Sequence, residues 1–79
     1  MNPALDLRAI RKNIAARVFL EMSEKGIQKE EFAKRADVSP GVIYQLRHQK
    51  GNPTLETLDK VAKALGITLG KLCDPNHRE

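Results

Sequence analysis

The sequence predicts an all-α fold, a compact domain of five short helices, and three observations lead to that prediction. Apolar residues recur every three or four positions within each segment, which is the spacing of one helix face. The composition, with 41% hydrophobic and only 4% aromatic residues, favours an aliphatic helical core over a β-sandwich. Gly and Pro separate the segments. The 79 residues suffice for a single domain, residues 1–79, with a core over about 6–73 and short frayed termini.

The first helix is predicted over Asp6–Lys25 and ends at Gly26. Phe19 and Leu20 fall partly off its apolar stripe. We expect these two side chains to widen the core face, and the alternative is an exposed patch for a partner. The stripe itself, with members three or four positions apart, comprises Leu7, Ile10, Ile14, Val18 and Met22.

The second helix is predicted over Lys29–Ala36, with Phe32 and Ala33 facing inward. Asp37 ends it, because Asp is one of the few residues with a side chain that tolerate a left-handed backbone. Val38 is then expected to point back into the core. Together with the next helix, this segment forms a helix, a short turn and a second helix that is presented outward.

The third helix is predicted over about residues 40–48. Ser39 is a favourable N-cap, and Pro40 suits the first helical position, where its missing N–H has no helical partner. Ile43 and Leu46, three positions apart, are expected to face the core. The opposite face carries Pro40, Gly41, Tyr44, Gln45 and His48.

The fourth helix follows the cap residue Thr54 and ends at Gly66. A final turn or two is predicted over Thr68–Cys73, and the tail beyond it is polar. The inward residues of these two segments are predicted to be Leu55, Leu58, Val61, Ala62, Leu65, Ile67, Leu69 and Leu72.

Charge is unevenly distributed around the third helix. The chain carries a net charge of +4, and no acidic residue occurs from Val38 to Leu55, where Arg47, His48 and Lys50 lie. This run alone would indicate no more than a solvated basic loop. Because the helix pair presents the same segment outward, binding of a polyanion such as double-stranded DNA is the better interpretation.

The residue types needed for catalysis or metal binding do not gather in this sequence. Cys73, the single cysteine, cannot form an intramolecular disulfide, and we expect a half-buried thiol near a helix end rather than a nucleophile. Glu30 and Glu31 form a solvated pair without the features of an acid/base dyad. We therefore expect no enzyme activity, no cofactor and no metal. The sequence shows no secretory signal or membrane-length apolar run, so we expect a cytosolic protein.

The stretch KEEFAKRADVSPGVIYQLRHQKGNPTLETLDKVAKALGITLGKL resembles the lambda-repressor-like helix-turn-helix domains, the Cro and phage-repressor group also called the XRE family. The resemblance covers roughly residues 13–72. Its fixed points include the small residue Ala33, the tight turn before Val38, and the downstream NPTLETL and AKALGI segments. The family implies five helices, the third of them in the DNA major groove, and binding as a two-fold homodimer.

The sequence departs from this family pattern in the turn and at two helix starts. Asp37 stands where the family usually has Gly. Gln28 and Lys29 stand where a Ser or Thr cap followed by Gln is usual, although the Lys29 ammonium can still reach a phosphate. Pro40 and Gly41 occupy two base-reading positions without a side chain that forms hydrogen bonds.

A further departure concerns an ion pair inside the domain. The family often has Glu late in the third helix, paired with an Arg of the first helix. Here those positions hold Arg47 and, near the second, Met22. We therefore expect that pair to be absent and Arg47 to be freer to contact a phosphate.

The resemblance assigns base reading to the outward face of the third helix. Gln45 can bond two atoms of an adenine edge. Tyr44 can contact a phosphate, a base or a thymine methyl, or it is simply a half-buried aromatic. Val42 either touches a thymine methyl or packs at the rim, while Pro40 and Gly41 allow close approach of the helix N-terminus. Candidate phosphate contacts are Lys29, Ser39, Arg47, His48, Lys50 and Asn52, with His48 otherwise facing solvent.

Two functions remain open from the sequence. The first is a stand-alone transcriptional repressor of phage, mobile-element or restriction-control type that binds a pseudo-palindromic operator. The second is a protein-interaction module, such as an antitoxin or anti-regulator, which exposure of Phe19 and Leu20 would support. The family's dimer contacts point to the region of residues 67–75, although core packing is the simpler account of Leu69 and Leu72.

Overall fold

The computed structural model describes residues 7–74, and this part of the chain contains five helices and no strand. The prediction of an all-α, five-helix fold is therefore confirmed. Asp6, the expected start of the first helix, lies outside the described residues. The helices are α1 (Leu7–Lys25), α2 (Lys29–Ala36), α3 (Pro40–Arg47), α4 (Leu55–Leu65) and α5 (Leu69–Leu72).

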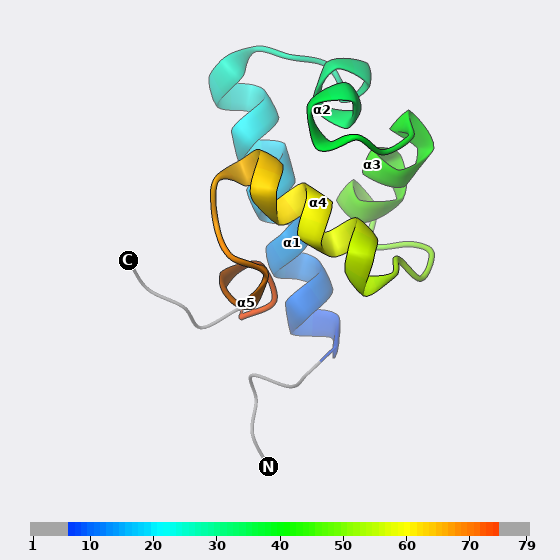
Figure 1. The fold of residues 1–79 in the computed structure, drawn as a ribbon. Coiled ribbons are helices and arrows are strands. Elements are labelled where there is room, and N and C mark those ends of the chain that lie inside the picture. Colours follow the sequence, from blue (N-terminus) through cyan, green and yellow to red (C-terminus); the bar gives the residue numbers. More distant parts are fainter. Residues whose placement is uncertain (1–6, 75–79) are drawn as a thin grey trace.

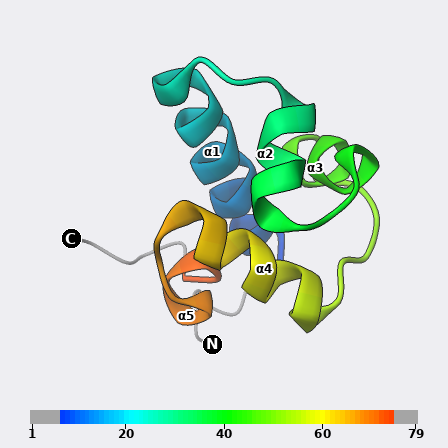
Figure 2. The ribbon, with the colours of Figure 1, turned by 45° about the horizontal axis from the view of Figure 1, so that its top comes forward.

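The long helix α1 runs along the domain, and the shorter helices α3, α4 and α5 pack onto it (Figure 1). Helix α3 packs against both α1 and α2, while α4 packs against α2, α5 and α1. Figure 2 shows α2 and α3 side by side, with the connection from α3 to α4 running round the edge of the molecule. This connection, residues 48–54, is called the α3–α4 loop below.

The core draws one or more apolar side chains from every helix. The largest completely buried side chains are Phe32, Ile43, Leu72, Val18 and Val61. No polar or charged residue is buried among the described residues. Hydrophobic burial therefore holds the five helices together, and the polar residues remain on the surface for other roles.

The first four helices end in the same way, at a residue with a left-handed backbone. In each case the N–H of the next residue donates to the carbonyl five positions earlier, which closes the last helical turn. At α3, for example, the Lys50 N–H donates to the Gln45 carbonyl at 2.8 Å. The predicted left-handed turn at Asp37 is confirmed, whereas that at Gln49 was not predicted. The four residues are Gly26 (φ 61°), Asp37 (φ 60°), Gln49 (φ 58°) and Gly66 (φ 75°).

Four apolar residues expected in the core are exposed instead. Leu7 is 62% exposed and Leu55 is 72% exposed. Each is the first residue of its helix, where the neighbouring helices no longer cover the inward face. Phe19 (54% exposed) and Leu20 (56% exposed) lie roughly 100° or more round α1 from the centre of the buried stripe, beyond the reach of the core.

Candidate nucleic-acid interface

Helix α3 buries one face and leaves the other free, as its sequence predicts. Ile43 and Leu46 are buried against the core. The outward residues Pro40, Gly41, Tyr44 and Gln45 are all exposed, and so is His48 at the helix end. Val42 lies between the two faces and packs against the edge of the core. The predicted base-reading residues therefore share one surface, except that Val42 is partly engaged in packing.

The first turn of α3 has open space around it and little side-chain bonding. Ser39 occupies the N-cap position, but its hydroxyl does not form the expected hydrogen bond to the helix. The helix begins instead through the backbone, where the Val42 N–H donates to the Ser39 carbonyl at 3.0 Å. A Cβ atom at Gly41 would approach only the Ser39 hydroxyl, at 3.9 Å. Nothing inside the described chain therefore requires glycine at this position.

The second turn of α3 carries side chains that can form hydrogen bonds. Tyr44 is 46% exposed, and its ring lies 4.3 Å from that of His48, measured between centroids. Gln45 leans toward the α3–α4 loop: a Cβ atom at Gly51 would lie 2.8 Å from its Oε1 atom. Gly51 also has a φ of 73°, a conformation that favours glycine. The carboxamide of Gln45 and the loop are therefore in close contact.

The predicted phosphate contacts differ in how far other side chains engage them. Lys50 is exposed on the α3–α4 loop. Lys29 forms an ion pair with its neighbour Glu30 at 3.2 Å. The pKa of the Glu30 carboxyl is lowered, first by hydrogen bonding to its own backbone and then by the Lys29 side chain. Because both side chains are exposed, this ion pair is weak and a phosphate can compete for the Lys29 ammonium.

Arg47 is less free than the sequence predicted. Its guanidinium carbon lies 5.1 Å from the centroid of the Phe19 ring on α1. Attraction between a cation and an aromatic face contributes about 0.5–1 kcal/mol at an exposed site. The Phe19 ring therefore attracts the guanidinium of Arg47 toward α1, and a phosphate would have to compete with the ring for it.

Asn52 has a partner that the sequence did not predict. The Arg11 guanidinium on α1 donates from Nη2 to Asn52 Oδ1 at 3.1 Å and from Nη1 to the Gln49 carbonyl at 3.4 Å. These contacts join positions 41 and 38 residues apart. Sequence periodicity places Arg11 beside the apolar stripe, but nothing in the pattern indicates where the distant loop would lie.

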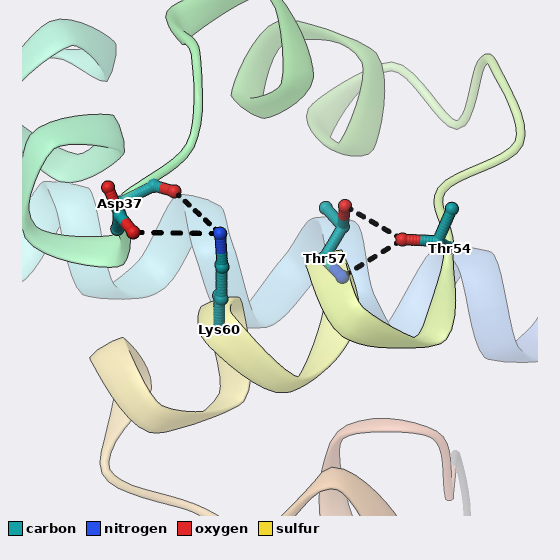
Figure 3. A network of polar contacts seen from close by, with 4 residues as sticks. All are labelled: Asp37, Thr54, Thr57 and Lys60. Atoms are coloured by element: carbon teal, nitrogen blue, oxygen red, sulfur yellow. Dashed lines mark hydrogen bonds and ion pairs between the residues drawn. The ribbon is translucent and has the colours of Figure 1, made fainter.

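The turn between α2 and α3 is held by α4. The Lys60 ammonium lies 3.5 Å from the Asp37 carboxylate and donates to the Asp37 carbonyl at 3.4 Å (Figure 3). The same view shows Thr54, whose hydroxyl accepts the Thr57 N–H at 3.1 Å and caps α4. The left-handed turn that aims α3 outward is thus tied to a second helix.

Other chemistry finds little support in the described part of the chain. Residues 7–74 contain no group of three or more His, Cys, Asp or Glu side chains placed to bind a metal. Cys73 is partly buried, and this burial raises the pKa of its thiol. A raised pKa leaves less of the reactive thiolate at neutral pH, in keeping with the expectation that Cys73 is not a nucleophile. None of the described helices has the length and apolar character of a membrane span.

Comparison with known proteins adds two findings. Residues 19–72 match the family model described as helix-turn-helix. The fold is similar to the crystal structure of the clp gene regulator ClgR from Corynebacterium glutamicum. That similarity has a TM-score of 0.63 and 27% sequence identity, over 80% of this chain and 67% of that chain. No curated protein sequence matches the chain.

Proposed function

Because this chain belongs to the helix-turn-helix family of the Cro and phage-repressor type, a family of DNA-binding transcription regulators, we propose that it is a sequence-specific repressor. In this proposal α3 lies in the major groove of double-stranded DNA. Two copies bind a pseudo-palindromic operator whose half-sites are about 34 Å apart, one turn of the duplex. Occupation of a promoter then blocks transcription in a bacterial or phage-infected cell, where the protein is cytoplasmic and associated with the nucleoid.

The observation that carries the proposal is the outward face of α3. Its side chains contribute nothing to the core, and they lie within the stretch from Val38 to Leu55, which contains no acidic residue. A surface with this charge can approach the phosphate backbone without repulsion. Helix α3, which is exposed on this surface, fits the width of the major groove.

The two turns of α3 have different roles in this proposal. The first turn, with Pro40 and Gly41, brings the backbone close to the duplex because it carries no bulky side chain. The second turn, with Tyr44 and Gln45, reads base edges. Specificity then depends on few direct contacts, supplemented by the shape and deformability of the operator.

A dimer is part of the proposal because operators of this kind are two-fold symmetric. Leu72 is completely buried in the core and is not available for a subunit contact. Leu69 and Cys73, its neighbours in the region proposed for dimer contacts, are only partly buried. Sedimentation of the protein with and without operator DNA tests whether two copies assemble.

The central experiment selects bound sequences from random DNA at two salt concentrations, using wild-type protein. We expect an enriched palindromic site and affinity that falls steeply with salt. The variant Gln45→Ala should lose about 1–3 kcal/mol of binding free energy on the selected site, with relaxed preference at one base pair. Lys50→Ala should weaken binding to every sequence to a similar extent. An equal loss on operator and random DNA from Gln45→Ala would refute the base-reading role of Gln45.

The exposure of Phe19 and Leu20 favours a second candidate, a protein-interaction module such as an antitoxin or anti-regulator. The two side chains are more than half exposed on α1, although the Arg47 guanidinium lies over the Phe19 ring. Leu20→Ala offers a clean test, since the change removes exposed apolar surface without opening the core. This function requires a stoichiometric protein complex that Leu20→Ala weakens, together with no salt-sensitive binding to DNA.

A further inference from the structure

The α3–α4 loop has little side-chain packing to hold it in place. A cleft of about 200 Å³ separates it from the first turns of α1 and is lined by Leu7, Ile10 and Ile14 on the α1 side. A second cleft, of about 180 Å³, lies toward α4. Asn52 and Pro53 border both clefts. The polar contacts that cross these spaces therefore help to fix the position of the loop, beside the backbone hydrogen bonds that tie its start to α3.

Arg11 provides such a contact from α1. It donates to the side-chain oxygen of Asn52 and to the backbone carbonyl of Gln49, so it holds the loop at two points. A guanidinium can only donate hydrogen bonds, so the Asn52 carboxamide must turn its oxygen toward Arg11. Its NH₂ group is then directed away from Arg11, and Asn52 is exposed. This orientation suits a donor to a phosphodiester oxygen.

The same loop limits where the Gln45 side chain can lie. Gly51, between the two residues that Arg11 contacts, is close enough to Gln45 that a single added methyl group would collide with its carboxamide. A shift of the loop toward α3 would therefore displace Gln45, and a shift away would release it. The position of the loop therefore sets the space that is open to the proposed base-reading side chain.

We propose that Arg11 is a positioning residue for DNA recognition, an inference that rests on the proposed function. From α1 it fixes the α3–α4 loop, which turns the Asn52 NH₂ group toward a phosphate and restricts Gln45 to one orientation. Restricting a side chain before binding reduces the entropy lost on binding. The gain in affinity from restricting Gln45 applies to the cognate site, where Gln45 has a base edge to bond.

The test compares Arg11→Ala with Lys12→Ala on the selected operator and on random DNA. Lys12 is a matched control because it is exposed on the same helix, has the same charge, and forms no hydrogen bond or ion pair within residues 7–74. We expect both variants to lose a small amount of affinity for random DNA, because each removes one positive charge. The loss should be slightly larger for Arg11→Ala, because Asn52 also loses its orientation toward a phosphate, a contact that forms on any sequence. On the operator, Arg11→Ala should lose about tenfold more than Lys12→Ala, with relaxed preference at the base pair that Gln45 reads.

Arg11→Lys separates positioning from charge. Lysine keeps the charge but lacks the planar fork that reaches Asn52 and Gln49 together. We expect Arg11→Lys to bind random DNA only slightly less tightly than the wild type, and to lose operator preference like Arg11→Ala. In an Arg11→Ala background, Asn52→Ala should then cause little further loss.

Three results would overturn the proposal. The first is that Arg11→Ala and Lys12→Ala lose the same affinity on both DNAs. The second is that Arg11→Ala loses more affinity than Lys12→Ala, but by the same factor on operator and on random DNA. The third is that Arg11→Lys has the operator preference of the wild type. Thermal unfolding of each variant checks that it is folded at the assay temperature. If Arg11→Ala is not folded, the comparison of Arg11→Lys with the wild type decides the test. A wild-type protein that fails to bind DNA would refute the proposed function itself, so the two failures are distinguishable.

Discussion

Two residues with side chains hold left-handed backbone conformations, and their circumstances differ. Asp37 (φ 60°) belongs to a residue type that tolerates this region, and its carbonyl and carboxylate both lie near the Lys60 ammonium. Gln49 (φ 58°) has no such chemical preference. Its backbone carbonyl accepts a hydrogen bond from Arg11, but its side chain is exposed. Gln49 is thus a strained residue whose side chain does not compensate for the strain.

Replacing Gln49 with glycine should therefore stabilise the domain. The left-handed conformation costs a residue with a Cβ atom roughly 1–2 kcal/mol, and glycine avoids this cost. Part of the gain is lost again, because glycine makes the unfolded chain more flexible and so stabilises the unfolded state. We expect Gln49→Gly to raise the free energy of unfolding by about 0.5–1 kcal/mol. Urea denaturation measures the change. Gln49→Ala, which keeps the Cβ atom, should give no gain, and equal stability of the two variants would show that position 49 is unstrained.

At the scale of the helices, the N-terminal caps are of two kinds. Thr54 and Thr68 each accept a backbone N–H three residues later, at 3.1 Å in both cases. Ser39, in the same position before α3, has a favourable residue type but makes no side-chain bond. The hydroxyl of Ser39 is therefore left for another acceptor or donor, in keeping with its proposed contact to a phosphate.

This difference predicts unequal effects from removing the two hydroxyl groups. Thr54→Ala deletes a formed cap and should lower the free energy of unfolding by about 1 kcal/mol. Ser39→Ala should change it by much less, because no cap bond is lost. Chemical denaturation of both variants provides the measurement. An equally large loss in Ser39→Ala would mean that its hydroxyl caps α3 in solution.

At the scale of the whole molecule, stability depends on a core assembled from all five helices. Helix α4 shows where that core ends. Leu58 is only 9% exposed, whereas Leu55, one turn earlier on the same helix, is 72% exposed. A domain of this size buries a modest apolar area, so the loss of one core side chain removes a large share of its stability.

The two leucines make a matched pair for testing this account. Leu58→Ala should lower the free energy of unfolding by about 2–5 kcal/mol, because it removes buried surface and leaves a cavity. Leu55→Ala should change it by less than about 0.5 kcal/mol, as is usual for exposed positions. Thermal unfolding of both variants decides the matter. A large loss in Leu55→Ala would place that residue in a buried interface, such as one between two copies.

Helical spacing predicted much of this architecture, because burial and periodicity are linked. It placed Phe32, Ile43 and Val61 inside, while the end of α2 at Asp37 followed from the residue type. The same spacing failed at Leu55 and Leu7, since periodicity carries no information on where neighbouring helices stop covering a face. Phe19 failed for a different reason, because hydrophobic character alone does not say which side of a long helix is covered.

The candidate site was predictable only where it lies on one element. The outward residues of α3, including Tyr44 and Gln45, follow from the period of that helix. The contact of Arg11 with Asn52 does not, because it depends on how a loop folds back onto a helix far away in the sequence. The role of each side chain toward DNA stays a prediction until binding is measured.

The way in which the first four helices end affects which residues of the protein can be substituted without loss of the fold. Backbone hydrogen bonds close the ends of the first four helices, and α3 contributes only its buried face to the core. The outward side chains at positions 41, 44 and 48 therefore contribute little to folding, and Pro40 contributes only a favourable start to α3. A library randomised at these positions should contain mostly folded members, so that the sequence preference of the protein can diverge, or be engineered, on an unchanged scaffold.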